Sequence, residues 1–118
     1  MEIFSNVVRG LAGALELHQQ RHRIISENLA NVETPGYRAR DLAFHDALDA
    51  AFAGEGRAAA KSAEAVVDTS TPVKIDGNSV DLDIETTRLA DNAFRIVTLS
   101  RILAKKYAGL KEMIAELR

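Results

Sequence analysis

Apolar and bulky side chains recur along the first part of the chain at alternating spacings of four and three residues. This heptad spacing predicts one long amphipathic helix from about residue 3 to residue 32. Polar residues such as Glu16, Arg23 and Glu27 occupy the other faces. Gly10 and Gly13 weaken the helix by about 1 kcal/mol each relative to alanine. The heptad positions are Phe4, Val8, Leu11, Leu15, His18, His22, Ile25, Leu29 and Val32.

The last part of the chain repeats this spacing. Its heptad positions are Leu82, Thr86, Leu89, Ala93, Ile96, Ser100, Leu103, Tyr107, Leu110, Ile114 and Leu117. We expect Asn78 or Ser79 to cap this second helix, because Asp81, Asp83 and Glu85 then lie at the positive end of its dipole. The sequence thus predicts a mainly α fold. Its two long terminal helices pack as an antiparallel coiled-coil-like hairpin around a short irregular or small β middle segment.

The stretch Thr34-Pro35-Gly36-Tyr37 interrupts the first helical pattern. Proline fixes its own φ and disfavours helical geometry at the residue before it, and glycine tolerates positive φ. The four residues therefore predict a type II turn. The chain divides accordingly into an N-terminal core helix (1–33), a middle segment (34–81) and a C-terminal core helix (82–118).

The middle segment differs in composition from both ends. Residues 40–52 predict a short helix with Asp41 as its cap. The apolar side of this helix would comprise Leu42, Phe44, Leu48 and Phe52. Residues 53–65 are small, polar and glycine-containing, and they predict a mobile linker. Residues 65–83 combine β-branched runs with an Asp76-Gly77 turn, which predicts a small hairpin.

Composition and charge narrow the classes of function. With 118 residues, 47% hydrophobic and 5% aromatic, the chain has material for one domain with an aliphatic core. A net charge of −2 without a basic stripe argues against nucleic acid, and the lack of cysteine excludes disulfides and thiolate metal sites. No apolar run reaches the roughly 18 residues of a membrane span, so we expect no direct membrane insertion. Glu2, Gly13 and Glu16 do not fit a Sec signal, so any export would proceed without signal cleavage.

Two clusters of side chains are candidate cation sites. His18 and His22 lie four residues apart on one helix face, as metal-binding imidazoles do, and His45 is a possible third ligand. The acidic cluster consists of Asp76, Asp81, Asp83 and Glu85, whose spacing does not match an EF-hand. The simpler interpretation makes the histidines interface residues, which would render assembly sensitive to pH. We therefore expect no catalytic residue, no metal and no cofactor.

The width of the apolar faces decides between a self-contained hairpin and an assembly subunit. An antiparallel pair covers one stripe on each helix, but Ile3, Val7 and Ile24 on the first helix and Val97 and Ile102 on the second lie beside that stripe. Such faces are typical of helices that pack against further helices. We expect the terminal regions to be partly disordered in the free subunit and to become ordered on assembly.

The stretch NLANVETPGY at residues 28–37 resembles a signature of the flagellar axial proteins, the rod and hook subunits of the bacterial flagellum. The matching residues of this corner motif are Asn28, Ala30, Asn31, Thr34, Pro35, Gly36 and Tyr37. The C-terminal region is similar to that of proximal rod subunits. The Gln-Arg-Ala-Tyr-Glu-Ala-Asn type of ending that typifies other rod and hook proteins is absent.

The resemblance implies a non-enzymatic subunit of the proximal rod in the periplasm, exported unfolded through the flagellar type III apparatus and polymerised into the shaft that transmits torque. The implied partners are further copies of the chain, the C-type rod protein, the adaptor between membrane ring and rod, and the export apparatus. Tyr37 would anchor the corner against a neighbour. A non-polymerising helical adaptor or chaperone-like module is the alternative, and an enzyme with a histidine metal site is a third. The expected assembly core comprises Val8, Leu11, Leu15, Ile25, Leu29, Leu89, Ile96, Leu103, Leu110 and Ile114.

Overall fold

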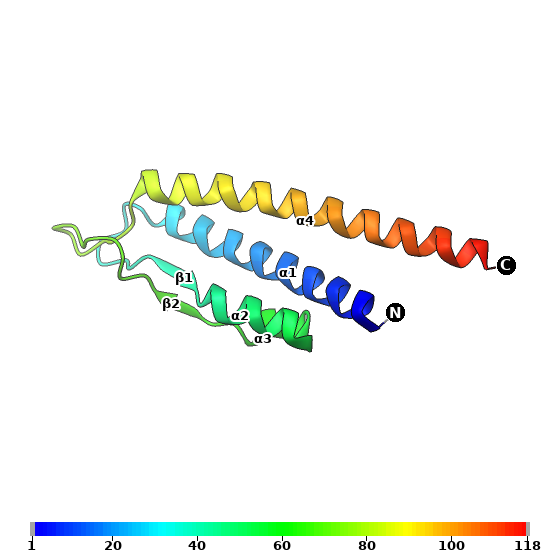
Figure 1. The fold of residues 1–118 in the computed structure, drawn as a ribbon. Helices are drawn as coiled ribbons and strands as arrows, with labels where there is room; N and C mark the ends of the chain where they lie inside the picture. Colours follow the sequence, from blue (N-terminus) through cyan, green and yellow to red (C-terminus); the bar gives the residue numbers. More distant parts are fainter. Residues whose placement is uncertain (1, 118) are drawn as a thin grey trace.

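A computed structural model describes residues 2–117 and shows two long antiparallel helices with a smaller layer beside them (Figure 1). Helix α1 spans Glu2–Ala30 and helix α4 spans Leu82–Glu116. They lie side by side, and the described chain is 67 Å long but only 23 Å and 16 Å across. The mainly α fold with a terminal helix hairpin, predicted from the heptads, is confirmed.

The middle segment folds onto the side of α1 that faces away from α4 (Figure 1). Its elements are β1 (Arg40–Leu42), α2 (Phe44–Ala50), the single wide turn η1 (Ala51–Glu55), α3 (Ala58–Ser62) and β2 (Ala65–Val67). The strands pair antiparallel, with Asp41 opposite Val66. Helix α1 is therefore the central layer of the molecule.

The prediction of a mobile linker over residues 53–65 is wrong. Ala59 and Ala60 of α3 are buried and join a core cluster with Leu17 and Ile24 of α1 and Leu42 of β1. Alanine methyl groups pack closely on α1, so a run of small residues forms a helix here. Ile24, which the sequence placed on a face that packs against a further element, is covered by the chain's own middle layer.

Two glycines allow this close packing. A Cβ atom on Gly10 would collide with the ring of Phe52, and one on Gly13 would collide with the backbone carbonyl of Gly56. Any larger side chain would push η1 and α3 away from the helix. Gly10 and Gly13 thus lower the helix propensity of α1, but they allow the middle segment to pack closely against it.

The predicted caps and the predicted hairpin need correction. The N-cap of α4 is Asp81, whose carboxylate accepts the backbone N–H of Ile84 at 3.1 Å, because Asn78 and Ser79 bind the corner instead. Helix α2 has no side-chain cap, because Asp41 pairs with Arg21.

The Asp76-Gly77 turn is present, with Gly77 at φ 84° and its N–H donating to Lys74 O at 2.9 Å. It joins no pair of strands, however, because β2 pairs with β1. Residues 65–67, which include the β-branched Val66 and Val67, therefore pair with residues 40–42, and the predicted hairpin within 65–83 is wrong.

The two long helices differ in how much of them is buried. Helix α1 buries Gly10, Gly13, Ala14, Leu17, His18, Ile24, Ile25 and Asn28. Helix α4, although longer, buries Glu85, Asn92 and Leu103.

Among residues 2–117, none of the helices combines the length and apolar character that a membrane crossing requires.

Candidate functional site

The corner has the geometry that its sequence predicts. Tyr37 N–H donates to Thr34 O at 3.2 Å, and Gly36 has φ 78°, as the third residue of a type II turn requires. Gly36 N–H also donates to Asp76 O at 2.9 Å, which joins the turn to the segment leading into α4. The turn reverses the chain so that β1 runs back along α1 (Figure 1).

Asn28 is the side chain on which this corner converges. Its Nδ2 donates to Arg40 O at 2.8 Å and to Glu85 Oε2 at 3.3 Å, and its Oδ1 accepts Arg40 N–H at 3.0 Å and Tyr37 O–H at 3.1 Å. The residue is fully buried. One carboxamide therefore connects α1 with the corner, with β1 and with α4.

The other corner residues have smaller roles within the chain. Asn31 Nδ2 donates to Glu27 O at 2.8 Å, and Thr34 Oγ1 donates to Asn31 Oδ1 at 3.1 Å. Ala30 and Pro35 are exposed. Tyr37 is half-buried with its hydroxyl bound to Asn28, so the expected role of Tyr37 against a neighbouring subunit stays a prediction.

Three charged side chains continue the network that begins at Asn28: two on α4 and one just after β2. Glu85 is fully buried, and Arg88 Nη1 lies 3.4 Å from Glu85 Oε1 and 2.8 Å from Asp68 Oδ2. Burial raises the pKa of Glu85, and the Asn28 hydrogen bond and the Arg88 charge offset part of that rise. Burial alone would also raise the pKa of Asp68, but hydrogen bonds from Ser70 and Arg88 outweigh it and lower that pKa to about 2.

A second polar contact joins the helices near their middle. His18 Nδ1 lies 2.7 Å from Asn92 Oδ1, and Asn92 Nδ2 donates to His18 O at 2.7 Å. The His18 ring also lies against Phe44, with ring centroids 4.6 Å apart. His18 is therefore an interface residue, as the simpler interpretation of the sequence held.

The structure does not bring the candidate metal ligands together. His22 is half-buried, with no hydrogen-bond partner at Nδ1, whereas His45 is exposed on α2 with Nε2 3.6 Å from Asp49. No group of three or more potential ligands forms anywhere in residues 2–117. The acidic cluster is split as well, since Asp81 caps α4 and Glu85 is buried beside Asn28.

The residues of the expected assembly core differ in how far the single chain buries them. Ile25 and Leu103 are buried, and Ile114 is 51% exposed. Half-buried positions are Val8, Leu11, Leu15, Leu29, Leu89, Ile96 and Leu110. The assigned heptad on α4 is off by one position near its start, because Thr86 and Ala93 are exposed while Glu85 and Asn92 face α1. At these two positions, polar residues that hydrogen-bond to α1 stand where a heptad would have apolar residues.

Several large apolar side chains of α4 are exposed to solvent. Phe94 is 72% exposed. Others on the same helix are Val97, Ile102, Tyr107, Met113 and Ile114. Beside Phe94 an open groove of about 450 Å³ runs between α4 and η1, with Leu48 and Phe52 on its far wall and Ala14 at its base. We call the exposed residues Phe94, Val97 and Ile102 the outer face of α4.

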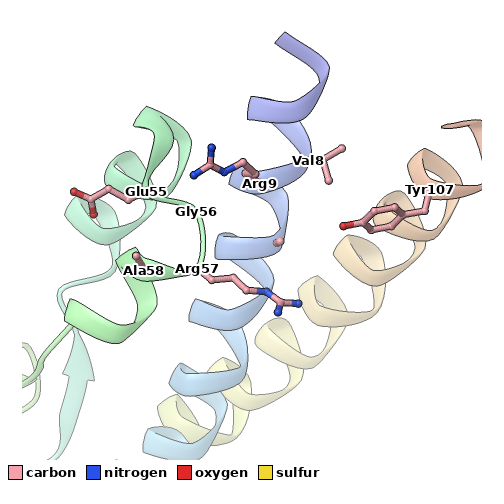
Figure 2. A pocket seen from close by; sticks show the side chains of 8 residues that line it. Val8, Arg9, Glu55, Gly56, Arg57, Ala58 and Tyr107 are labelled. Atoms are coloured by element: carbon pink, nitrogen blue, oxygen red, sulfur yellow. The ribbon is translucent and has the colours of Figure 1, made fainter. Parts of the chain in front are cut away.

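A second groove, of about 440 Å³, opens on another side of α1 (Figure 2). Val8 of α1 and Tyr107 of α4 form one side, and the segment Glu55–Ala58 forms the other. Arg57 reaches from that segment across α1, and its Nε lies 3.4 Å from Glu16 Oε2 (Figure 2). Both grooves are open to solvent and are lined by side chains of α1 and α4.

The fold and its surface define a class of protein: a helical hairpin clamped at one end, with a covering layer on one side and an uncovered apolar helix face on the other. The sequence model of the family described as "Flagella basal body rod protein" matches residues 9–38, which include most of α1 and the corner.

Relatives match over most of the chain. The flagellar basal body rod protein FlgB of Escherichia coli (strain K12) is 32% identical over 86% of this chain and 87% of its own length. FlgB of Bacillus subtilis (strain 168) is 29% identical over 97% of both chains, and FlgB of Yersinia enterocolitica is 28% identical over 87% and 89%. The chain belongs to the FlgB family of flagellar basal body rod proteins.

Proposed function

We propose that this protein is a structural subunit of the proximal rod that polymerises through α1 and α4 into the shaft transmitting motor torque. The observation that carries the proposal is the outer face of α4, with Phe94 72% exposed beside an open apolar groove. Fully burying a phenylalanine side chain contributes about 1.5–3 kcal/mol, so several such residues on one face favour packing against another helix. The protein is a building element and has no enzymatic role.

The proposed partners are other copies of the chain and other rod subunits, including the C-type rod protein and the adaptor below the rod. Their helices would lie in the two grooves beside α1, because each groove is open and is lined by side chains of both α1 and α4, against which a helix ridge can pack. The subunit would reach the periplasmic rod through the flagellar export apparatus without signal cleavage.

Phe94→Asp tests this proposal, because it places a charge on the outer face and leaves the buried side of α4 unchanged. In a strain lacking its own copy of this subunit, we expect the variant to be exported and folded but to give no swimming and no completed rods in isolated basal bodies. His45→Asp, which also places an acid at an exposed position, should swim normally. Normal swimming by Phe94→Asp would favour the non-polymerising adaptor.

Ile96→Asp is a second variant on the same helix. Ile96 is half-buried toward α1, so the substitution disturbs the hairpin as well as any assembly contact. We expect loss of motility with export largely intact. Comparison with Phe94→Asp separates loss of the subunit's fold from loss of its assembly.

A further inference from the structure

Local bonds close the C-terminus of α1. Asn31 N–H donates to Glu27 O and Asn28 O, both at 3.1 Å, and Val32 N–H donates to Leu29 O at 3.3 Å. No basic residue lies in the last turn, and among the described residues no non-glycine has positive φ, so Asn31 does not close the helix in the left-handed conformation. The corner continues with Thr34 N–H donating to Asn31 O at 3.0 Å and Tyr37 N–H donating to Thr34 O at 3.2 Å. Each of these carbonyls can accept a second donor.

Asn78, which lies just before α4, supplies a second donor to two of these carbonyls. Its Nδ2 donates to Asn31 O and to Thr34 O, both at 2.8 Å. Asn78 lies four positions before α4 begins and is fully buried. One amide group thus joins the residue that follows α1 to the first residue of the type II turn.

The Asn78 side chain is held in place by its own loop. Its Oδ1 accepts the N–H of Val80 at 2.7 Å, and its backbone N–H donates to Asp76 Oδ1 at 3.0 Å. These local bonds fix the carboxamide before it meets α1. The donors are therefore positioned by the segment that leads into α4.

Three further bonds run between the same two segments. Ser79 N–H donates to Tyr37 O at 3.0 Å, Ala39 N–H donates to Ser79 Oγ at 2.8 Å, and Gly36 N–H donates to Asp76 O at 2.9 Å. Residues 36–39 and 76–79 are thus joined by two backbone bonds and by one bond to the Ser79 hydroxyl, and neither segment has this set of partners without the other.

We propose that Asn78 is a positioning residue that caps α1 from the entry segment of α4, so that the corner adopts its turn only when α4 is docked. The direction in which the chain leaves α1 depends on the segment that leads into α4. The placement of the middle layer depends on that direction. The corner motif alone is insufficient to form the corner. This proposal does not depend on polymerisation.

Asn78→Asp in the full chain tests the donor role, because the aspartate keeps an oxygen for Val80 N–H and removes both N–H donors. We expect amide exchange at the corner, measured at Gly36 and Tyr37, to accelerate tenfold or more, while amides at residues 12–24 of α1 keep their protection. Asn31→Ala, which removes a corner side chain with local bonds only, is the matched control and should change corner exchange less than threefold. Unchanged corner exchange in Asn78→Asp would refute the capping role.

Asn92→Ala tests the coupling from a distance, because it weakens α4 docking near the middle of the hairpin and touches no corner residue. We expect protection at Gly36 and Tyr37 to fall together with protection of the first turns of α4. Corner protection that stays at the wild-type level while that of α4 falls would overturn the coupling. If Asn78→Asp loses its helical circular dichroism altogether, the Asn92→Ala result alone decides.

Discussion

Asn28 and Glu85 lie 57 positions apart in the sequence, and the Nδ2 of one donates to the Oε2 of the other at 3.3 Å inside the joint between α1 and α4. The carboxylate is fully buried, and the same amide nitrogen also holds the backbone of β1 at Arg40. The most recognisable residue of the corner motif therefore acts inside the subunit, as the point where three segments are tied together.

Asn28→Ala is expected to destabilise the subunit by about 2–4 kcal/mol, because it removes four hydrogen bonds and leaves buried partners such as Glu85 unsatisfied. Urea unfolding followed by circular dichroism measures the change. Ala30→Ser, at an exposed position of the same motif, is the control and should stay within about 0.5 kcal/mol of wild type. Equal effects of the two variants would contradict a central role for Asn28.

Gly13→Ala is expected to lower the free energy of unfolding by about 1–3 kcal/mol, because the added methyl group collides with the carbonyl of Gly56 and displaces the middle layer. Gly109→Ala is a matched control, since nothing lies within 4 Å of the position a Cβ would take there. That second variant should stabilise α4 by about 0.5–1 kcal/mol through helix propensity. Thermal unfolding of both variants checks the opposite signs.

The stability of the hairpin is expected to fall as the pH drops below 6.5. Burial lowers the pKa of His18 from 6.5, the Asn92 hydrogen bond offsets part of this, and the charges of Arg95 and Arg21 lower it further. The unfolded chain therefore binds a proton that the folded chain excludes, and its contribution to stability is lost as pH falls through the folded-state pKa. His18→Gln should flatten the dependence of the urea midpoint between pH 7.5 and pH 5.5, and His45→Gln should leave it unchanged.

Amide exchange in the dilute subunit is expected to be uneven along α4. No residue after Leu103 is buried within the described part of that helix. Residues 104–116 should therefore exchange fast in the free subunit and become protected in assembled rods, whereas Tyr37 and Ser79 at the corner should be protected in both. Strong protection of the whole of α4 in the monomer would show that its exposed residues need no partner for order.

The sequence predicted what local rules determine. Heptad spacing placed both long helices, and the chemistry of Pro35 and Gly36 identified the turn, because these signals act within a few residues. The contacts that hold the site together join residues far apart in the chain. Asn78 looked like a helix cap and is one, but for the end of α1 and not for the start of α4.

The short helix α2 falls within the predicted range 40–52, but the rest of the middle layer was missed for a similar reason. Residues 58–62, Ala-Ala-Ala-Lys-Ser, resemble a linker until Gly10 and Gly13 are known to leave room for a second backbone on α1. Glu85 and Asn92 fell outside the heptad because polar residues score against an interface, although each has a partner on α1. A search for polar residues at core positions of both helices would have suggested these pairs.

Both termini of the described chain lie at the same end of the hairpin, opposite the corner (Figure 1). A pulling force on either terminus would therefore peel α1 and α4 apart one turn at a time, and it would not have to shear the whole interface at once. The first turns to separate hold no buried side chain on α4. Mechanical resistance would therefore rise first at Leu103 and then again near His18 and Asn28. An apparatus that pulls on one end of this polypeptide would therefore meet little mechanical resistance when it begins to unfold the hairpin.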